Sequence, residues 1–248
     1  MRLTVLTPAF NEEDVIERSC AKILDALPSD SELLVVDDGS VDATPKLLAA
    51  AATADDRIRV VTHSTNRGLG AALSTGFASA TGDVIITMDA DLSHPVALME
   101  KLESACHEAD AAFASRYIAG GGMHGVPWWR QAVSRAANGV LRRVLRLPVR
   151  DITTGYRAFR AEVVRDMPLE STGFEVQLEL SARLVASGRT IVEVPLMLEQ
   201  RAAGMSKMRY FRLIPRYAKA FALARRLRRA PTALGIGCDH SRISHRLH

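Results

Sequence analysis

The sequence predicts an α/β fold with a mostly parallel, doubly wound central sheet and helices on both faces. The first 90 residues contain four apolar runs rich in branched side chains, and each has the length and composition of a buried strand. A segment with helical length and composition separates each run from the next. Strands that alternate with helices fold as parallel βαβ units with right-handed crossovers, which predicts the class of fold.

The elements of the first half follow directly from these runs. We expect strands at residues 3–8, 32–36 and 57–61, and a fourth strand from residue 84. We expect one helix at residues 12–27 and another at residues 66–80. Between them we expect a third helix, with Asp42 or Thr44 as its N-terminal cap.

The second half is less regular and shows neither a domain linker nor an internal repeat. Its expected strands are residues 111–116 and 190–194, and its expected helices are residues 131–147 and 173–186. A glycine-rich loop at residues 120–125 could act as a mobile lid over a site, or it could be an inert surface excursion.

The composition of the chain excludes several classes of protein. Its 248 residues are 48% hydrophobic and 24% charged, which is ordinary for a globular protein with a substantial core. Cys20, Cys106 and Cys238 are odd in number and widely spaced, so we expect no disulfide framework and no zinc site. No signal peptide and no membrane-spanning apolar run is visible, so we expect a cytoplasmic protein.

Polar residues follow three of the predicted strands: Asn11 and Glu12, then Asp37 and Asp38, then Asp89 and Asp91. The carboxyl ends of parallel strands meet at one edge of the sheet, which is where α/β sheets bind ligands. At alternate positions of an extended chain, Asp89 and Asp91 would point the same way and repel each other unless a cation lay between them. This favours a site for Mg²⁺ or Mn²⁺, although such a pair in isolation could also be a solvated loop or a helix cap.

Residues 66–70, with the sequence Asn-Arg-Gly-Leu-Gly, precede the third predicted helix. Their backbone amides could bind a phosphate, or the glycines could simply allow the helix to begin. The dinucleotide fingerprint is absent because Leu73 stands where its third glycine would be.

The C-terminal part is strongly basic, with nine lysines and arginines and no acid at residues 207–229. Apolar residues alternate with these cations at near-helical spacing, which predicts a basic amphipathic helix at residues 210–230. This helix could lie on an anionic membrane, or it could pack on the core and expose its charged face. We expect residues 231–248 to be a disordered tail, and no motif for nucleic-acid binding is present.

Seven motifs, in order along residues 1–210, resemble the glycosyltransferase family 2 enzymes, specifically the dolichol-phosphate (polyprenol-phosphate) mannose synthases. The motifs are residues 7–12, 36–40, 66–70, 88–91, 115–117, 151–160 and 201–207. The resemblance implies a GT-A type, Rossmann-like catalytic domain at residues 1–209. It also implies inverting transfer of mannose from GDP-mannose to a polyprenyl (dolichyl-type) phosphate, with the acceptor phosphate as nucleophile.

The resemblance also implies roles for individual residues. Nucleotide and donor contacts would come from Pro8, Phe10, Glu12, Asp37, Asp38, Arg67, Asp89 and Ala90. Asp89 and Asp91 would hold Mg²⁺ or Mn²⁺, whereas Ser93 stands where the family often has a glutamine ligand. The phosphates would be handled by Arg116, Arg130, Ser134 and Arg201, with Ser206 and Lys207 in a closing loop. Among these, the residues expected to be catalytic are Asp91, Arg116, Arg130 and Arg201.

Two other functions remain open at this point. A related enzyme would use UDP-glucose or another UDP-sugar with the same class of acceptor. A silent module would bind a nucleotide sugar without catalysis. Because no spanning segment is predicted, the protein would be peripheral on the cytoplasmic face of the membrane, either through its own surface or through a membrane-embedded partner protein.

Overall fold

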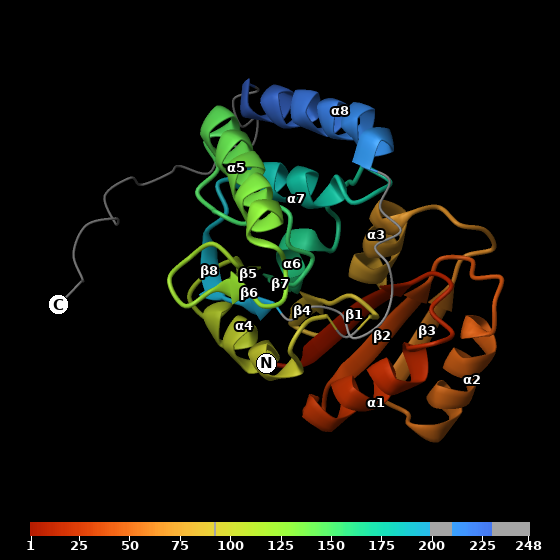
Figure 1. Ribbon diagram of the computed structural model, residues 1–248. Helices are drawn as coiled ribbons and strands as arrows, with labels where there is room; N and C mark the ends of the chain where they lie inside the picture. The colour runs from red at the N-terminus through yellow and green to blue at the C-terminus, as the bar shows by residue number, and fades with distance from the viewer. Residues whose placement is uncertain (92, 199–209, 230–248) are drawn as a thin grey trace.

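The computed structural model describes residues 1–91, 93–198 and 210–229 (Figure 1). A seven-stranded sheet lies at its centre in the order β3-β2-β1-β4-β7-β5-β8. All strands of this sheet are parallel except β7, which runs antiparallel to both β4 and β5. The predicted fold class, with a mostly parallel sheet, is therefore confirmed.

The strands of this sheet are β1 (Leu3–Ala9), β2 (Glu32–Asp37), β3 (Ile58–Thr62), β4 (Val84–Thr87), β5 (Ala111–Ser115), β7 (Arg157–Arg160) and β8 (Ile191–Pro195). Two further short strands, β6 (Gly122–Met123) and β9 (Met197–Leu198), pair with each other. The helices are α1 (Ile16–Ala26), α2 (Thr44–Ala54), α3 (Leu69–Ser79), α4 (Met99–Ala105), α5 (Trp128–Leu145), α6 (Ala161–Val164), α7 (Val176–Ala186) and α8 (Tyr210–Arg229). The short 3₁₀ helix η1 (Val96–Leu98) leads into α4.

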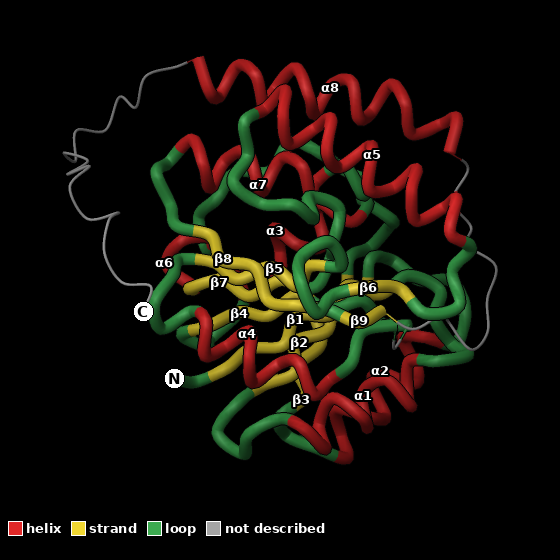
Figure 2. The backbone as a smooth tube through the Cα atoms, turned by 60° about the vertical axis from the view of Figure 1, so that its left-hand side comes forward, coloured by secondary structure: helices red, strands yellow, loops and turns green. Residues whose placement is uncertain are grey.

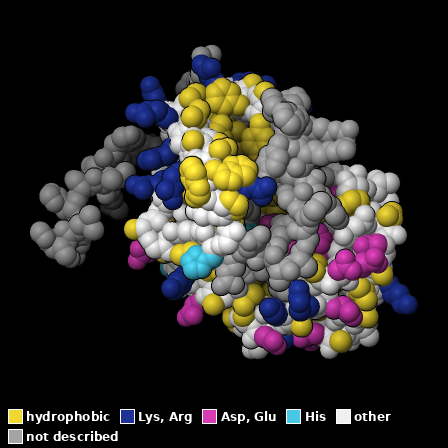
Figure 3. Space-filling model, viewed as in Figure 1, with side chains coloured by type: hydrophobic (Ala, Val, Ile, Leu, Met, Phe, Trp, Pro, Cys, Tyr) yellow, Lys and Arg dark blue, Asp and Glu magenta, His cyan; other side chains and the backbone are white. Residues whose placement is uncertain are grey.

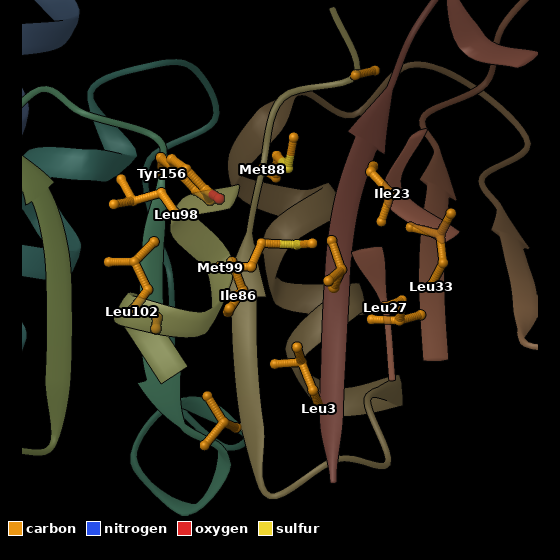
Figure 4. Packing of buried hydrophobic residues seen from close by; sticks show 14 of the residues in the cluster. Leu3, Ile23, Leu27, Leu33, Ile86, Met88, Leu98, Met99, Leu102 and Tyr156 are labelled. Atoms are coloured by element: carbon orange, nitrogen blue, oxygen red, sulfur yellow. The ribbon is translucent and has the colours of Figure 1, made fainter. Parts of the chain in front are cut away.

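Helices cover both faces of the sheet because the central strands are apolar on both sides. Along β1, Val5 faces the cluster that α1, α2 and α4 close, and the next residue, Leu6, faces the other cluster. The second cluster is closed by α3, α5, α7 and α8, and Figure 2 shows the sheet between the two groups of helices. Figure 4 shows the first cluster, in which Met88, Met99 and Tyr156 pack beside β4.

Three predictions about elements were wrong in part. The helix expected from residue 12 begins at Ile16, because residues 11–13 bond to the loop after β2 instead. The glycine-rich loop contains β6, which anchors it to β9. The segment 151–160, where no strand was expected, contains β7, which has an arginine at each end and lies between β4 and β5.

The predicted C-terminal helix is present as α8, and its apolar face is packed. Ala220 and Ala224 are buried, and Tyr217, Phe221 and Leu227 pack against the second core cluster. Of the two alternatives, the described residues therefore support a core-packing helix with a charged outer face. Across the described chain, no helix has the length and apolarity needed to cross a bilayer.

Two of the three cysteines lie in the described residues, and both are buried free thiols. Burial raises the pKa of Cys20 and of Cys106 to about 11, so neither is a nucleophile at neutral pH. Cys20 and Cys106 therefore serve as small core residues, whereas Cys238 lies outside the described residues.

Candidate active site

The loops that follow β1 and β2 are joined by hydrogen bonds at the carboxyl edge of the sheet. The Asn11 amide donates to Ser40 Oγ, and the Val41 amide donates to Asn11 Oδ1, both at 2.9 Å. Asn11 adopts a left-handed conformation, with φ of 54°, to make this contact. The two loops therefore form one wall, on which Pro8 and Glu12 are half-buried and Phe10 is exposed.

Asp37, at the end of β2, is fully buried, and one of its carboxylate oxygens has no hydrogen-bond donor among the described residues. Its Oδ1 accepts a hydrogen bond from the Ser40 amide at 3.0 Å. Its Oδ2 is also buried, and no described residue donates to it. A buried carboxylate oxygen without a donor is costly, so Asp37 is well suited to a ligand that brings a donor with it.

Asp38 holds the neighbouring loop together. Its Oδ1 contacts His63 Nδ1 at 2.6 Å and accepts from the Arg67 amide at 2.9 Å. Its Oδ2 accepts from the Gly68 amide at 2.7 Å. Both oxygens are therefore engaged by protein groups, which gives Asp38 a structural role in placing Arg67, whose side chain is exposed.

The glycines at 68 and 70 allow the start of α3 to approach residues 171 and 172. A Cβ on Gly68 would clash with the Thr172 carbonyl, and one on Gly70 would clash with the Ser171 carbonyl. The Gly70 amide donates to that Thr172 carbonyl at 3.2 Å. Because the amides of Arg67, Gly68 and Gly70 all have protein acceptors, the structure supports a glycine-dependent helix start over a phosphate-binding loop.

The acidic pair lies in the turn that follows β4. The strand ends at Thr87 and the chain turns at Ala90, so alternation along an extended chain does not orient Asp89 and Asp91, contrary to our expectation. Asp91 Oδ1 accepts from the Ser93 amide at 2.9 Å, and Asp89 Oδ2 lies 3.9 Å from His94 Nε2. The side chain of Asp89 is 37% exposed and thus open to a ligand.

The segment before β7 packs directly against this acidic turn. Thr87 Oγ1 donates to the Gly155 carbonyl at 2.7 Å, and the Tyr156 hydroxyl donates to the Pro95 carbonyl at 3.0 Å. The ring of Tyr156 also stacks on His94, with centroids 4.7 Å apart. This contact follows from topology, because the start of an antiparallel strand lies beside the end of its neighbour.

Gly155 brings Gln177, in the first turn of α7, close to Asp89. A Cβ placed on Gly155 would lie 3.3 Å from Asp89 Oδ1 and 3.6 Å from Gln177 Nε2. The Gln177 side chain is buried, and its Oε1 has no hydrogen-bond partner among the described residues. Sequence reasoning missed Gln177, because a polar residue early in an amphipathic helix gives no signal of its own.

Arg116 follows β5 and forms a buried ion pair with Asp151. Its Nε and Nη2 each bond to a carboxylate oxygen of Asp151 at 2.7 Å, and Nη2 also donates to Thr153 Oγ1. Burial lowers the pKa of Arg116, but the bonds to Asp151 outweigh this and raise it overall, so the guanidinium stays charged. Bidentate pairing fixes the plane of the guanidinium beside the site.

Tyr117 joins this ion pair to helix α5. Its hydroxyl is 2.7 Å from Ser134 Oγ, and its ring lies beneath the guanidinium groups of Arg116 at 5.2 Å and Arg135 at 5.7 Å. Arg130, four residues before Ser134, is exposed, with its guanidinium 5.1 Å from the Trp129 ring. The structure thus brings Arg116 and Ser134 together through Tyr117, which sequence reasoning did not single out.

Arg157 is a fully buried arginine that organises the segment before β7. It donates to the carbonyls of Ile152, Thr154 and Gln177 at 2.6, 2.9 and 3.0 Å, and it lies over the ring of Phe113. Burial lowers the pKa of Arg157 to about 9, which still leaves it charged at neutral pH. Through these bonds it anchors residues 151–155 to the start of α7.

The predicted metal site consists of the Asp89 and Asp91 carboxylates. Ala90 between them is buried, and Ser93 contributes its amide to Asp91. Within the described ranges, no group of three or more His, Cys, Asp or Glu side chains could enclose an ion. Such a site fits Mg²⁺ or Mn²⁺ that takes its other ligands from substrate phosphates and water. The predicted site residues Arg201, Ser206 and Lys207 lie outside the described residues.

Comparison with known proteins decides the family. The model of the family described as Glycosyl transferase family 2 matches residues 4–167. The chain belongs to glycosyltransferase family 2. It is 38% identical to the polyprenol monophosphomannose synthase of Mycolicibacterium smegmatis, over 84% of this chain and 81% of that protein. It is 36% identical to the undecaprenyl-phosphate mannosyltransferase of Micrococcus luteus, over 84% of this chain and 88% of that protein.

Solved structures confirm the GT-A fold of this family 2 glycosyltransferase. Glucosyl-3-phosphoglycerate synthase from Mycobacterium tuberculosis, solved with Mn²⁺, UDP and glucosyl-3-phosphoglycerate, superposes with a TM-score of 0.70. The match covers 94% of this chain and 81% of that one at 20% identity. The same enzyme with Mg²⁺ and UDP gives a TM-score of 0.68 at 22% identity, over 90% of this chain and 79% of that one.

Proposed function

We propose that this glycosyltransferase transfers mannose from GDP-mannose to a polyprenyl phosphate, with inversion at the anomeric carbon. The observation that carries the proposal is the similarity to two polyprenyl-phosphate mannosyltransferases over most of both chains. The arrangement of the site supports it, because acids and arginines suited to two phosphate-bearing substrates converge at one edge of the sheet.

The donor would bind along the carboxyl ends of β1, β2 and β4. Asp37 Oδ2, which has no donor among the described residues, would accept a hydrogen bond from the base or ribose. Asp89 and Asp91 would hold Mg²⁺ or Mn²⁺, which when bound neutralises the negative charge on the departing diphosphate. Gln177, buried beside Asp89, would be within reach of the sugar.

The acceptor would bind between β5 and α5. An oxygen of its phosphate attacks the anomeric carbon as the bond from that carbon to the diphosphate breaks, so GDP leaves from the opposite face. The nucleophile is already an anion, so the reaction needs no strong general base. Arg130 and Ser134 would instead hold the phosphate against the repulsion of the donor, Arg130 through paired hydrogen bonds. Arg116, whose Nε and Nη2 are bonded to Asp151, would contribute its positive charge and its Nη1.

A transfer assay with the purified protein tests this proposal. GDP-mannose, UDP-glucose and UDP-N-acetylglucosamine would each be offered with a polyprenyl phosphate, with Mn²⁺ or with EDTA. We expect product from GDP-mannose alone, and none in the presence of EDTA. In Asp91→Ala we expect the rate of transfer to fall by a factor of about 100 or more, as it does when one electrostatic contact to a transition state is removed.

Other outcomes would contradict parts of the proposal. Product from a UDP-sugar would identify a different donor for the same reaction. Nucleotide binding without product from any donor would favour a silent module. Full activity of a folded Asp91→Ala protein would remove the acidic pair from the mechanism.

A further inference from the structure

Helix α5 exposes an apolar stripe to solvent. Figure 3 shows it as a column of hydrophobic side chains over the position of α5, flanked by Lys and Arg side chains. The members of the stripe and their exposed fractions are Trp128 80%, Trp129 52%, Val133 64%, Val140 62% and Val144 51%. Isolated apolar residues on a surface are common, but a contiguous stripe with two tryptophans indicates a binding surface.

The stripe lies opposite the face by which α5 is attached to the protein. The attached face carries Asn138 and Leu145, which are buried. Asn138 bonds to the Ile152 amide at 2.8 Å and to the Ser134 carbonyl at 3.0 Å. At 3.6 residues per turn, Val140 points about 200° away from Asn138, so the stripe cannot also contact the core.

The segment that carries the stripe has charges of a single sign. Residues 111–150 contain seven arginines and no acid. Six of these arginines, on α5 or just after it, have exposed side chains: Arg130, Arg135, Arg142, Arg143, Arg146 and Arg150. An apolar stripe on a segment whose charged residues are all cations complements a membrane surface, which has anionic headgroups above an apolar interior.

We infer that α5 is the surface by which this protein docks on an anionic phospholipid bilayer. Helices of this kind lie in the interface with their apolar face among the acyl chains and their cations at the headgroups. Tryptophan favours the same depth because its ring is apolar and its N–H is polar. A second copy of the chain is a poorer occupant, because pairing two stripes would bring the arginines together without an acid between them.

This inference changes the expected docking surface from α8 to α5. Five apolar residues described on α8 belong to the second core cluster or pack against it, so they are not exposed to a membrane: Tyr217, Ala220, Phe221, Ala224 and Leu227. Its exposed Arg216, Lys219, Arg225 and Arg226 lie at the same end of the molecule as α5 and add to the cationic surface (Figures 1 and 2). The inference rests on exposure and charge, and it stands whether or not the proposed transfer reaction is correct.

Docking through α5 would also place the catalytic edge at the membrane. The first turns of α5 carry the exposed tryptophans together with Arg130 and Ser134, and Ser134 is bonded to Tyr117 next to Arg116. A phosphate on a membrane-embedded lipid would therefore reach these groups beside the inserted stripe.

The fluorescence of the unmodified protein tests the inference directly, because Trp128 and Trp129 are the only tryptophans in the chain. The full chain would be titrated with phosphatidylglycerol vesicles and with phosphatidylcholine vesicles, neither containing a polyprenyl lipid. With phosphatidylglycerol, we expect a blue shift of the emission, quenching by brominated acyl chains and reversal by salt. Emission that does not change, whether or not the protein sediments with the vesicles, would overturn the inference.

Substitutions provide a second test by vesicle sedimentation. Val140→Asp should weaken binding to phosphatidylglycerol vesicles at least ten-fold, whereas Val41→Asp, at a valine 87% exposed on the loop after β2, should not. Arg142→Gln should weaken binding about five-fold, and the exposed Arg18→Gln on α1 should have little effect. Equal loss in test and control variants, or a dimer by light scattering that Val140→Asp dissociates, would contradict docking on a membrane.

Discussion

At the scale of single residues, the site contains two buried oxygens for which the described residues supply no partner. Asp37 Oδ2 and Gln177 Oε1 are both buried, and neither has a hydrogen-bond partner among the described residues. By contrast, Asp38 and Asp151 each have both carboxylate oxygens bonded. A substrate that supplied donors to these oxygens would recover the cost of leaving them unpaired.

Asp37→Asn should weaken nucleotide binding without destabilising the fold. The amide keeps the shape of the side chain but removes a charged acceptor, and a hydrogen bond to a charged group contributes about 1.5–3 kcal/mol. Calorimetric titration with GDP should show a ten-fold or larger rise in Kd. The exposed Asp56→Asn serves as the control, and unchanged affinity in Asp37→Asn would exclude contact with the nucleotide.

At the scale of elements, the antiparallel strand β7 completes the site. Its direction places residues 151–155 beside the acidic turn after β4, where Gly155 contacts Thr87 and Asp151 holds Arg116. Arg157, on β7 itself, anchors the same segment to α7 through three backbone carbonyls. One strand and the segment before it therefore link the acidic turn after β4 to Arg116 and to α7.

Arg157→Met should destabilise the protein by about 3 kcal/mol or more, because three buried carbonyls would lose their donor. Urea unfolding measures this change in the free energy of unfolding. Arg160→Met, on the same strand, is the matched control. Arg160 is only partly buried and bonds to the carbonyls of Cys106 and His107, so its loss should cost about 1 kcal/mol. Equal losses of unfolding free energy in the two variants would show that the burial of Arg157 does not determine its contribution to stability.

Glu179 on α7 makes stability depend on pH. Burial raises the pKa of Glu179, but bonds from the Glu170 and Ser171 amides and from Arg183 outweigh this and hold it below its usual 4.5. A carboxylate with a lowered pKa stabilises the fold above about pH 4.5, and this contribution is lost as the pH falls further.

Glu179→Gln should therefore lower the midpoint of thermal unfolding at neutral pH, and the difference from the unmodified protein should shrink below about pH 4.5. Unfolding curves recorded between about pH 7 and about pH 3 measure this. The exposed Glu162→Gln is the control and should follow the unmodified protein throughout. A difference that is independent of pH would show that the charge of Glu179 contributes nothing.

At the scale of the whole molecule, α8 is part of the folded core and the stripe on α5 is the exposed apolar surface. Both helices lie at one end of the molecule, on the same side of the sheet (Figure 2). The two helices are both basic and amphipathic, but α8 buries apolar residues that α5 would leave exposed. Contact with α7 buries the apolar face of α8, whereas the attachment of α5 through Asn138 leaves its apolar stripe outside.

Ala224→Glu should destabilise the protein by about 3 kcal/mol or more, because it forces a charge into a fully buried position of α8. Ala218→Glu, on the exposed face of the same helix, should change stability by less than about 0.5 kcal/mol. Thermal unfolding compares the two variants. Equal stability would show that the packing of α8 against α7 is not required for the fold.

The sequence alone determined the class of fold, most of the elements and the family. Strand and helix periodicity are local properties, and the motifs of the family are contiguous. It therefore predicted the parallel strands, the position of Asp89 and Asp91 after β4, and the presence of a helix in the basic C-terminal segment. It also singled out Arg116 and Ser134 as candidate site residues, and the structure connects these two residues through Tyr117.

The tertiary structure alone decided which polar groups have partners and which apolar faces are covered. Neighbours distant in sequence decide that Arg157 anchors the segment before β7. They also decide that both oxygens of Asp38 are bonded, whereas one oxygen of Asp37 has no partner among the described residues. The same holds for the finding that α8 packs its apolar residues on the core while α5 exposes its apolar stripe, since both sequences are amphipathic and basic. Hydrogen bonding and burial are pairwise properties of the folded chain, and no local pattern of residues contains them.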